Sequence, residues 1–368
     1  MHTQSNFRLL IVRLGAMGDI LHALPAVTAL RLAHPDWQIG WVIEPRWQPL
    51  LKAGDRDQGS GINGDRSAAA TIHDSAMPVA NRLHFAPSRE WKRHPLSSAT
   101  RRAIGALRRE LRAAEYSAVL DLQGAIRSAV IARMTGCPRR IGEASPREWP
   151  AQWLFTERVV THGAHVIEQD VELASAIAGD ALSAVDVQLP IDPDAEAWCA
   201  AWLASTFPGA ARPIALITPG AGWGAKRWPP ERYATVAEGL AQRGLHVVVN
   251  AGPGEEPLAA AIASGSAVAL TATLPQLIAL TRRIALCIGG DTGPLHLASA
   301  LGRSVVGIYG PTDPSRNGPY GTRARVLRSP DSRRDYSRRS EPDPGLLTIA
   351  PDDVLRATDE LLAEEGAR

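Results

Sequence analysis

The sequence has few cysteines and almost no net charge, which excludes several specialised classes of protein. Its 368 residues include only three cysteines, Cys137, Cys199 and Cys287, far apart and without metal-ligand or redox spacing. We expect them to be small buried apolar side chains in a reducing compartment, with no disulfide framework. The 40 basic and 38 acidic residues give a formal charge of +2, so overall electrostatics gives no reason to expect a nucleic-acid partner.

Long hydrophobic runs and metal-binding patterns are also missing. The longest apolar runs stop well short of the roughly 20 residues that a membrane helix needs, and the N-terminus lacks an ordered signal peptide with a cleavage site. The ten histidines show no H-E-x-x-H or similar spacing, and no D-x-D pair sits where a divalent ion would bridge a diphosphate. We therefore expect a cytosolic protein that holds no metal. The 45% hydrophobic and 21% charged residues suit a globular chain with two cores.

What the sequence does contain is a repeated alternation of strands and helices. Apolar and β-branched runs bounded by glycine and proline predict strands at 8–13, 38–43, 118–122, 214–219, 246–250, 284–290 and 304–310. Helical periodicity predicts helices at 19–33, 98–115, 231–243, 294–301 and 352–365. Alternation at this spacing predicts an α/β protein with parallel sheets covered on both faces. Because the pattern occurs twice, we expect two doubly wound, Rossmann-like domains that bind ligand at the carboxyl ends of their strands.

A strand-free stretch with prolines at both ends of a short helix, at roughly 185–212, marks the expected domain boundary. We predict an N-terminal domain over 1–190, a C-terminal domain over 191–350 and a closing helix over 351–368. Two segments are poor in large apolar groups, 54–76 and 331–345, and cannot bury enough area to offset their ordering entropy. We predict a mobile insertion at the first and a mobile loop at the second.

The first strand is followed by Gly15, Gly18 and Asp19, at a turn that enters a helix. The glycine spacing matches neither of the common nucleotide-loop patterns. Asp19 would sit at the carboxyl edge of the sheet, where the helix N-terminus favours a charged carboxylate. A chemical role in the cleft and an ordinary helix-capping role are both consistent with this position.

Two glycine-rich loops follow strands of the second half. IALCIGGDTGPLHLASALG places a Gly-Gly-Asp-Thr-Gly-Pro turn before a helix, which would offer backbone N–H groups to a phosphate. IALITPGAGWGAKRWPPERY carries Lys226 and Arg227 between Trp223 and Trp228, and a lysine supplies a point charge for phosphate. The alternatives are an ordinary turn capped by Asp291 and a solvated basic loop. Together the two loops suit a diphosphate better than either does alone.

The N-terminal half also contains a basic stretch, SREWKRHPLSSATRRAIGALRRELR (88–112), with eight basic and two acidic residues. Such a stretch would attract an anionic partner or an anionic membrane face, or it is a solvated basic helix face. Arg127 lies in the first turns of a predicted helix, where the dipole disfavours it unless something anionic is near.

Four of these segments resemble the ADP-heptose lipopolysaccharide heptosyltransferases, glycosyltransferase family nine. They are MGDILHALPAV (17–27), DLQGAIRSA (121–129), PGAGWGAKRWP (219–229) and GGDTGPLHLASALGRSVVGIYGPTDPSRNGPYG (289–321). The first two are more similar to enzymes that add the first heptose, and the third to enzymes that add the second. The resemblance covers most of the chain apart from the two loose segments. It implies the two-domain GT-B fold and an inverting transfer without a metal or cofactor.

The resemblance also implies roles for individual residues. Asp19 matches the general base that takes the proton of the acceptor hydroxyl, and Gly15 and Gly18 are the glycines of its turn. The residues that match the donor-binding group, which contacts the diphosphate and heptose, are Thr218, Lys226, Asp291, Thr292, Gly293 and His296. The basic residues that we assign to the acceptor, with its acidic Kdo sugars and phosphates, are Arg89, Lys92, Arg93 and Arg127.

The sequence therefore predicts a glycosyltransferase that moves heptose from ADP-heptose to a Kdo-lipid A core. We expect it in the cytoplasm, peripheral at the inner face of the cytoplasmic membrane. Two other functions stay open: transfer of another sugar or to another glycoconjugate on the same fold, and a catalytically silent protein that binds a nucleotide sugar. Retention of both Asp19 and Lys226 argues against the silent protein, since a mere binder has no use for a base.

Overall fold

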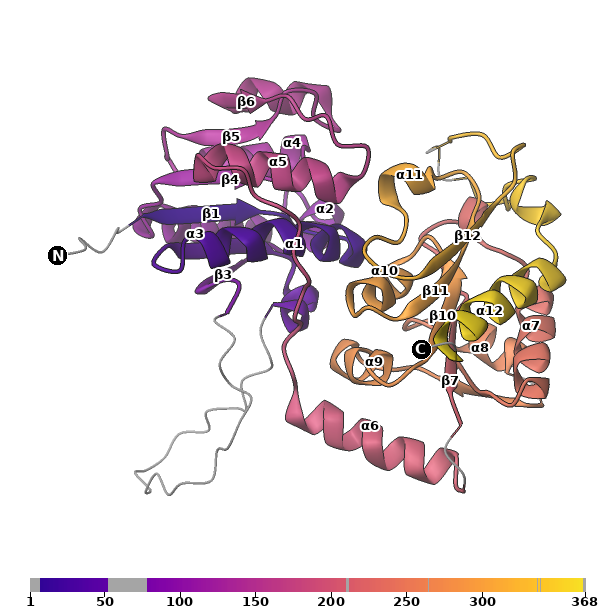
Figure 1. Cartoon of the computed structure of the whole chain (residues 1–368). Helices are drawn as coiled ribbons and strands as arrows, with labels where there is room; N and C mark the ends of the chain where they lie inside the picture. Colours follow the sequence, from indigo (N-terminus) through magenta and orange to yellow (C-terminus); the bar gives the residue numbers. More distant parts are fainter. Residues whose placement is uncertain are drawn as a thin grey trace, which may run out of the picture. The chain divides into compact units, whose positions relative to one another are not determined.

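The computed structural model describes residues 7–51, 78–209, 212–263, 265–335, 337 and 339–366. The chain divides into two compact units (Figure 1). The first unit comprises Met1–Gly15, Ala26–Thr161 and Val171–Ser183, and the second comprises Ala16–Pro25, His162–Asp170 and Ala184–Arg368. The predicted insertion at 54–76 lies outside the described residues.

A six-stranded parallel sheet forms the centre of the first unit, in the order β3-β2-β1-β4-β5-β6. Its strands are β1 (Arg8–Val12), β2 (Gln38–Ile43), β3 (Arg82–Phe85), β4 (Ala118–Asp121), β5 (Arg140–Glu143) and β6 (Glu157–Val159). The helices of this part of the chain are α1 (Met17–Ala33), α2 (Ser88–Arg93), α3 (Ser98–Ala113), α4 (Ile126–Met134) and α5 (Val166–Ala178). Two 3₁₀ turns complete it, η1 (Pro45–Leu50) and η2 (Trp149–Leu154).

The second unit repeats the same strand order in a second parallel sheet, β12-β11-β10-β7-β8-β9 (Figure 1). Its strands are β7 (Ile214–Thr218), β8 (His246–Asn250), β9 (Ala267–Leu270), β10 (Leu286–Gly290), β11 (Ser304–Tyr309) and β12 (Ala324–Arg328). Its helices are α6 (Pro193–Thr206), α7 (Pro230–Gln242), α8 (Glu256–Ile262), α9 (Leu274–Thr281), α10 (Gly293–Ala300), α11 (Pro314–Asn317) and α12 (Pro351–Gly366), with 3₁₀ turns η3 (Gly224–Lys226) and η4 (Leu346–Thr348).

The central strands are buried on both faces, which is why their sequences read as continuous apolar runs. The runs HVVVN in β8 and SVVGIY in β11 are almost entirely inaccessible to solvent. The α/β class is confirmed, with a doubly wound parallel sheet in each half, as the GT-B fold requires. The predicted strands agree with β1, β2, β4, β7, β8, β10 and β11 to within two residues at either end.

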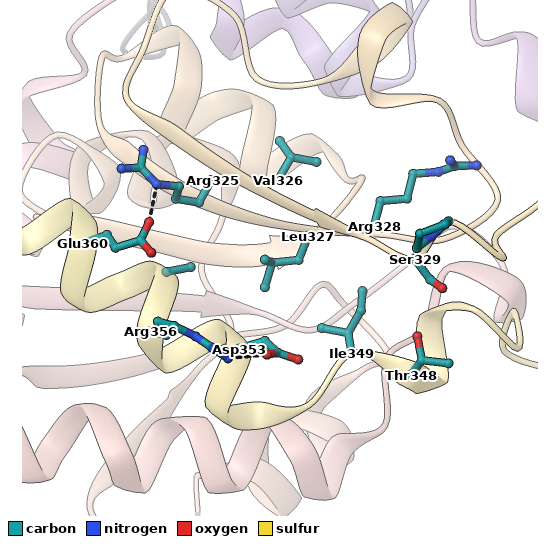
Figure 2. A pocket seen from close by; sticks show the side chains of 12 residues that line it. Arg325, Val326, Leu327, Arg328, Ser329, Thr348, Ile349, Asp353, Arg356 and Glu360 are labelled. Atoms are coloured by element: carbon teal, nitrogen blue, oxygen red, sulfur yellow. Dashed lines mark hydrogen bonds and ion pairs between the residues drawn. The ribbon is translucent and has the colours of Figure 1, made fainter.

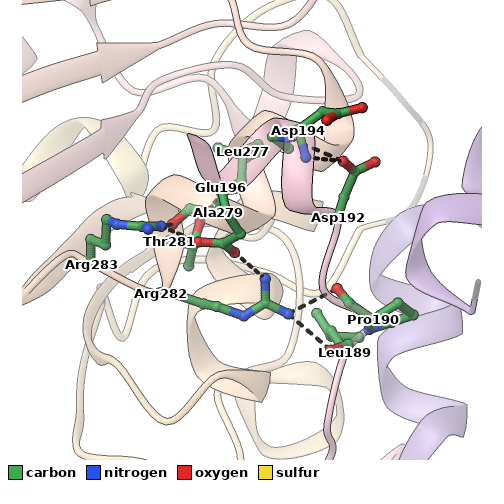
Figure 3. Close-up of polar contacts among 11 residues, drawn as sticks. Leu189, Pro190, Asp192, Asp194, Glu196, Leu277, Ala279, Thr281, Arg282 and Arg283 are labelled. Atoms are coloured by element: carbon green, nitrogen blue, oxygen red, sulfur yellow. Dashed lines mark hydrogen bonds and ion pairs between the residues drawn. The ribbon is translucent and has the colours of Figure 1, made fainter. Parts of the chain in front are cut away.

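The helix expected in the strand-free stretch is α6. Its N-terminus and the residues just before it contact the end of α9 in the second unit (Figure 3). Arg282, at the end of α9, donates to the carbonyl oxygens of Leu189 and Pro190 at 2.9 Å each and pairs with Glu196 of α6 at 2.7 Å. Asp192 caps α6 by accepting from two backbone N–H groups at 3.0 Å. The stretch before α6 is therefore held in place as far upstream as Leu189.

The closing helix α12 packs against α7, β11 and β12 of the second unit. Between β12 and α12 lies a groove of about 440 Å³ (Figure 2). Arg325 of β12 pairs with Glu360 and Glu364 of α12, and Arg356 pairs with Asp353. Arg328, which also lines the groove, donates to the carbonyl oxygens of Gly310 at 3.1 Å and Ser332 at 2.6 Å. Each charged group of the groove therefore already has a partner within the chain.

The described part of the 331–345 segment packs against the turn that contains Lys226. Ala225 N donates to the carbonyl oxygen of Arg339 at 3.0 Å, and Asp343 N donates to that of Ala225 at 3.2 Å. Asp343 is 3% exposed and accepts from Ser332 Oγ at 2.8 Å. The composition of the segment, from which we predicted a mobile loop, gave no indication of these contacts.

Candidate active site

The order of strands in the second unit reverses between β7 and β10, which lie side by side with Thr218 opposite Gly289. In open α/β sheets, ligands bind outside the carboxyl ends of the strands at such a reversal. The two glycine-rich loops begin at this point, one after β7 and one after β10. Strand topology alone therefore places Lys226 and Asp291 on neighbouring loops.

Lys226 is held inside this corner. Its Nζ forms an ion pair with the Asp291 carboxylate and lies 3.3 Å from the Asp291 carbonyl oxygen. The same nitrogen sits 4.1 Å from the centre of the Trp223 ring, a cation–π distance. The side chain is only 10% exposed. The alternative of a solvated basic loop therefore does not describe Lys226, whereas Arg227 beside it is exposed.

Asp291 accepts from two partners rather than capping the helix that follows it. Its Oδ1 lies 2.9 Å from Nε2 of His296, and its Oδ2 faces Lys226. Burial alone would raise the pKa of Asp291, but the hydrogen bond from His296 and the charge of Lys226 outweigh it and hold the pKa well below its usual range. The carboxylate is therefore ionised at neutral pH.

The beginning of α10 carries polar groups that the described residues leave unused. Thr292 is the residue at the N-cap, but its side chain makes no capping hydrogen bond. Thr292 Oγ1 and His296 Nδ1 are buried and have no hydrogen-bond partner among the described residues. Buried polar atoms without a partner are costly, so such atoms beside a helix N-terminus favour a site that a polar ligand completes.

At two positions of this corner a glycine leaves room for a neighbouring side chain. A Cβ on Gly289 would lie 2.2 Å from Thr218 Oγ1, and one on Gly18 would lie 2.8 Å from His296 Cδ2. Thr218 is buried, and its hydroxyl donates to the carbonyl oxygen of Ile288 at 3.4 Å. The structure thus gives the hydroxyl of Thr218 a partner within the sheet.

The start of α1 belongs to the same compact unit as this corner. The His22 ring of α1 lies 4.5 Å from that of His296 and 5.5 Å from that of His165, between ring centres. His165 Nε2 donates to the carbonyl oxygen of Gly318 at 3.0 Å. The motif MGDILHALPAV contains His22, but the sequence analysis gave that histidine no role, and His165 lies outside all four motifs. Histidines far apart in sequence carry no signal of their shared position.

Asp19 lies in the first turn of α1 and is half-buried. Its Oδ2 accepts from the backbone N–H of Ala16 at 3.2 Å, so part of its function is to stabilise the helix start. Gly15, just before, has a φ of 108°, a conformation that favours glycine. The turn therefore presents the carboxylate at the beginning of the helix.

The sequence that forms this corner matches a known protein family. The family described as "Glycosyltransferase family 9 (heptosyltransferase)" matches residues 104–344. The chain belongs to glycosyltransferase family 9. As a member of this family it is a glycosyltransferase, and the family predicted from the four motifs is confirmed.

Several relatives of this glycosyltransferase extend over most of its length. It is 28% identical to lipopolysaccharide heptosyltransferase 1 of Escherichia coli (strain K12), over 88% of this chain and 94% of that protein. It is also 28% identical to lipopolysaccharide heptosyltransferase 1 of Pseudomonas aeruginosa, over 85% of this chain and 81% of that protein. Among solved structures, E. coli heptosyltransferase WaaC with ADP has a TM-score of 0.73 at 24% identity, over 96% of this chain and all of that one.

The predicted acceptor residues of the glycosyltransferase lie in the first unit. Arg89, Lys92 and Arg93 are exposed on the short helix α2, and Arg127 is exposed on α4. The anionic group expected near the start of α4 is Glu148, whose Oε2 accepts from the backbone N–H of Ile126 at 2.8 Å. An intrachain carboxylate therefore accepts from one N–H of this helix end, and the acceptor role of Arg127 stays a prediction.

The described part of the glycosyltransferase contains no group of three or more His, Cys, Asp or Glu side chains that would hold a metal ion. Among its described helices, none is long and apolar enough to cross a membrane. All three cysteines are buried with free thiols.

Proposed function

We propose that this family 9 glycosyltransferase transfers heptose from ADP-heptose to a Kdo-lipid A inner core, with inversion at the anomeric carbon and without a metal. The observation that carries the proposal is the cluster of Lys226, Asp291 and His296 at the strand reversal of the second sheet. The names of the full-length relatives, lipopolysaccharide heptosyltransferases, supply the sugar and the class of acceptor.

In this proposal the second unit binds the donor. The diphosphate lies against Lys226 and the N-terminus of α10, where an ammonium and backbone N–H groups both favour negative charge. Thr292 Oγ1 and His296 Nδ1, buried without partners among the described residues, supply further polar contacts. The Asp291 carboxylate, kept ionised by His296 and Lys226, accepts hydrogen bonds from heptose hydroxyls rather than touching phosphate.

The reaction is a displacement in which Asp19 acts as the base. The acceptor oxygen forms a bond to the anomeric carbon, its proton passes to Asp19, and the bond from that carbon to the phosphate oxygen breaks. ADP leaves with the electron pair, and its new charge is stabilised by Lys226 and backbone N–H groups. General-base help of this kind contributes about 10²–10⁴ in rate, and fixed donors to the leaving group contribute at least as much.

The acceptor binds through basic residues of the first unit. Arg89, Lys92 and Arg93 form one exposed cationic group on α2, suited to the carboxylates of Kdo and the phosphates of lipid A. An acceptor that is anchored in a bilayer also implies a peripheral position of the enzyme at the inner face of the cytoplasmic membrane.

The proposal is tested by incubating the purified protein with ADP-heptose and a panel of truncated core acceptors, and weighing the products by mass spectrometry. We expect one heptose added to a Kdo-containing acceptor, at the same rate with and without EDTA. If the protein transferred sugar only from another sugar nucleotide, ADP-heptose would be the wrong donor. Activity lost in EDTA and restored by Mg²⁺ would refute the metal-free mechanism.

A further inference from the structure

An apolar patch on the first unit has no role in the proposed chemistry. Trp149 and Trp153 of η2 are 61% and 66% exposed, although indoles are normally well covered in a globular protein. Ile126 and Val130 of α4 are 43% and 44% exposed. The helix α4 and the turn η2 pack against each other, so these four side chains belong to one region of the surface. Several large apolar side chains exposed in one region of a surface indicate an interaction site.

The patch is held rigidly by the backbone beneath it. The N–H of Glu148 donates to the carbonyl oxygen of Gly124 at 2.8 Å, and the Glu148 carboxylate accepts from the N–H of Ile126 at the same distance. The rings of Trp149 and Trp153 meet edge to face, with centres 4.6 Å apart. Since η2 is fixed to the start of α4, the indoles are presented at little entropic cost on binding.

Positive charge surrounds the apolar side chains. Arg127 and Arg133 are exposed on α4, and Arg147 is exposed just before η2. None of the three forms an ion pair with another described residue. Of the nearby acids, Glu148 is engaged at the start of α4 and Glu157 pairs with Arg139 at 2.8 Å. Arginines without an ion-pair partner beside exposed tryptophans are typical of a surface that binds anionic lipid headgroups.

We propose that Trp149, Trp153, Ile126 and Val130 form a docking surface for an anionic lipid bilayer. The indoles enter the headgroup region, where their apolar body and polar N–H are both accommodated, and the arginines pair with lipid phosphates. A second copy of the chain is a poorer occupant, because a two-fold contact would bring the arginines of both copies to one interface. The inference rests on the proposed function in one respect: an enzyme with a lipid-linked acceptor has to reach a bilayer.

The test is sedimentation of the full-length protein with vesicles of phosphatidylglycerol and phosphatidylcholine, or of phosphatidylcholine alone. We expect the double variant Trp149→Ser/Trp153→Ser to bind the anionic vesicles at least about tenfold more weakly than the wild type. Leu32→Ser is the matched control, because Leu32 is 68% exposed in the same unit but on another helix, α1, and this variant should bind like the wild type. Arg133→Gln/Arg147→Gln should weaken binding mainly at low salt, since salt screens the charges but not the indoles.

Wild-type binding by the double tryptophan variant would overturn the proposal. Sedimentation velocity gives the other decisive outcome: a wild-type dimer that the tryptophan variant abolishes would make the patch a self-interface. Transfer to a water-soluble truncated acceptor should be unchanged in the tryptophan variant. If no protein transfers heptose to that acceptor, the proposed function fails, while the vesicle result still decides the docking surface.

Discussion

Replacing Lys226 by methionine tests the donor site, because the change removes the charge and keeps most of the length of the side chain. A hydrogen bond to a charged group contributes about 1.5–3 kcal/mol, which corresponds to a roughly 10- to 100-fold higher Kd for ADP. Lys226 is already paired with Asp291 before the ligand binds, so we expect the lower part of that range. Isothermal titration calorimetry with ADP measures the effect, and Arg227→Met, an exposed cation on the same loop, is the matched control with little effect expected.

The same variant has a cost in stability that must be separated from ligand binding. Removing one partner of a buried ion pair costs about 3–5 kcal/mol, and the His296 hydrogen bond to Asp291 should reduce that cost here. The variant Lys226→Met/Asp291→Asn should recover much of the free energy of unfolding in urea, yet still bind ADP weakly. An ADP affinity within twofold of the wild type in a folded Lys226→Met protein would refute the phosphate role of this lysine.

Three further changes test the base, the packing between β10 and β7, and a buried carboxyl. Asp19→Asn should keep ADP affinity and lower turnover at least about a hundredfold, measured as ADP release; near-normal turnover would remove Asp19 as the base. Gly289→Ala should lower the free energy of unfolding by about 1–3 kcal/mol, because a Cβ there would meet the hydroxyl of the facing threonine. Gly222→Ala, with no atom within 4 Å of the added carbon, should be near neutral in the same urea titration, and equal costs would contradict the packing argument. Burial raises the pKa of Asp121 to about 6, against about 3.9 in the unfolded chain, so its contribution to stability is full below pH 4 and is lost as pH rises through 6. The free energy of unfolding of the wild type, relative to that of Asp121→Asn, should therefore fall over that interval. A difference that stays constant with pH would refute the shift in pKa.

The strands that the sequence predicted are those buried on both faces, since only these have long apolar runs. The five that were not predicted are all short. Four carry charged residues, RLHF in β3, RIGE in β5, ERV in β6 and ARVLR in β12, and the fifth, AVAL in β9, is an apolar run of only four residues. Four of them, β3, β6, β9 and β12, are edge strands of their sheets. An edge strand is exposed along one side, so its sequence does not need the apolar run that identifies a central strand.

The candidate site was predicted residue by residue, but not as a set of contacts. Lys226 and Asp291 were each assigned to a phosphate-binding loop, yet their ion pair joins positions 65 residues apart and depends on β7 lying beside β10. Local sequence cannot give a pairing that strand order creates. The segment 331–345 shows the same limit, because composition predicted a mobile loop and did not reveal that Asp343 is buried and bonded to Ser332.

The central claim is that the second unit holds the diphosphate of the donor between the loop after β7 and the start of α10. A crystal structure of the protein with bound ADP tests it most directly. The account predicts phosphate oxygens within hydrogen-bond distance of Lys226 Nζ and of the backbone N–H of Gly293. ADP bound elsewhere, for example in the groove between β12 and α12, with the pair of Lys226 and Asp291 undisturbed, would contradict it.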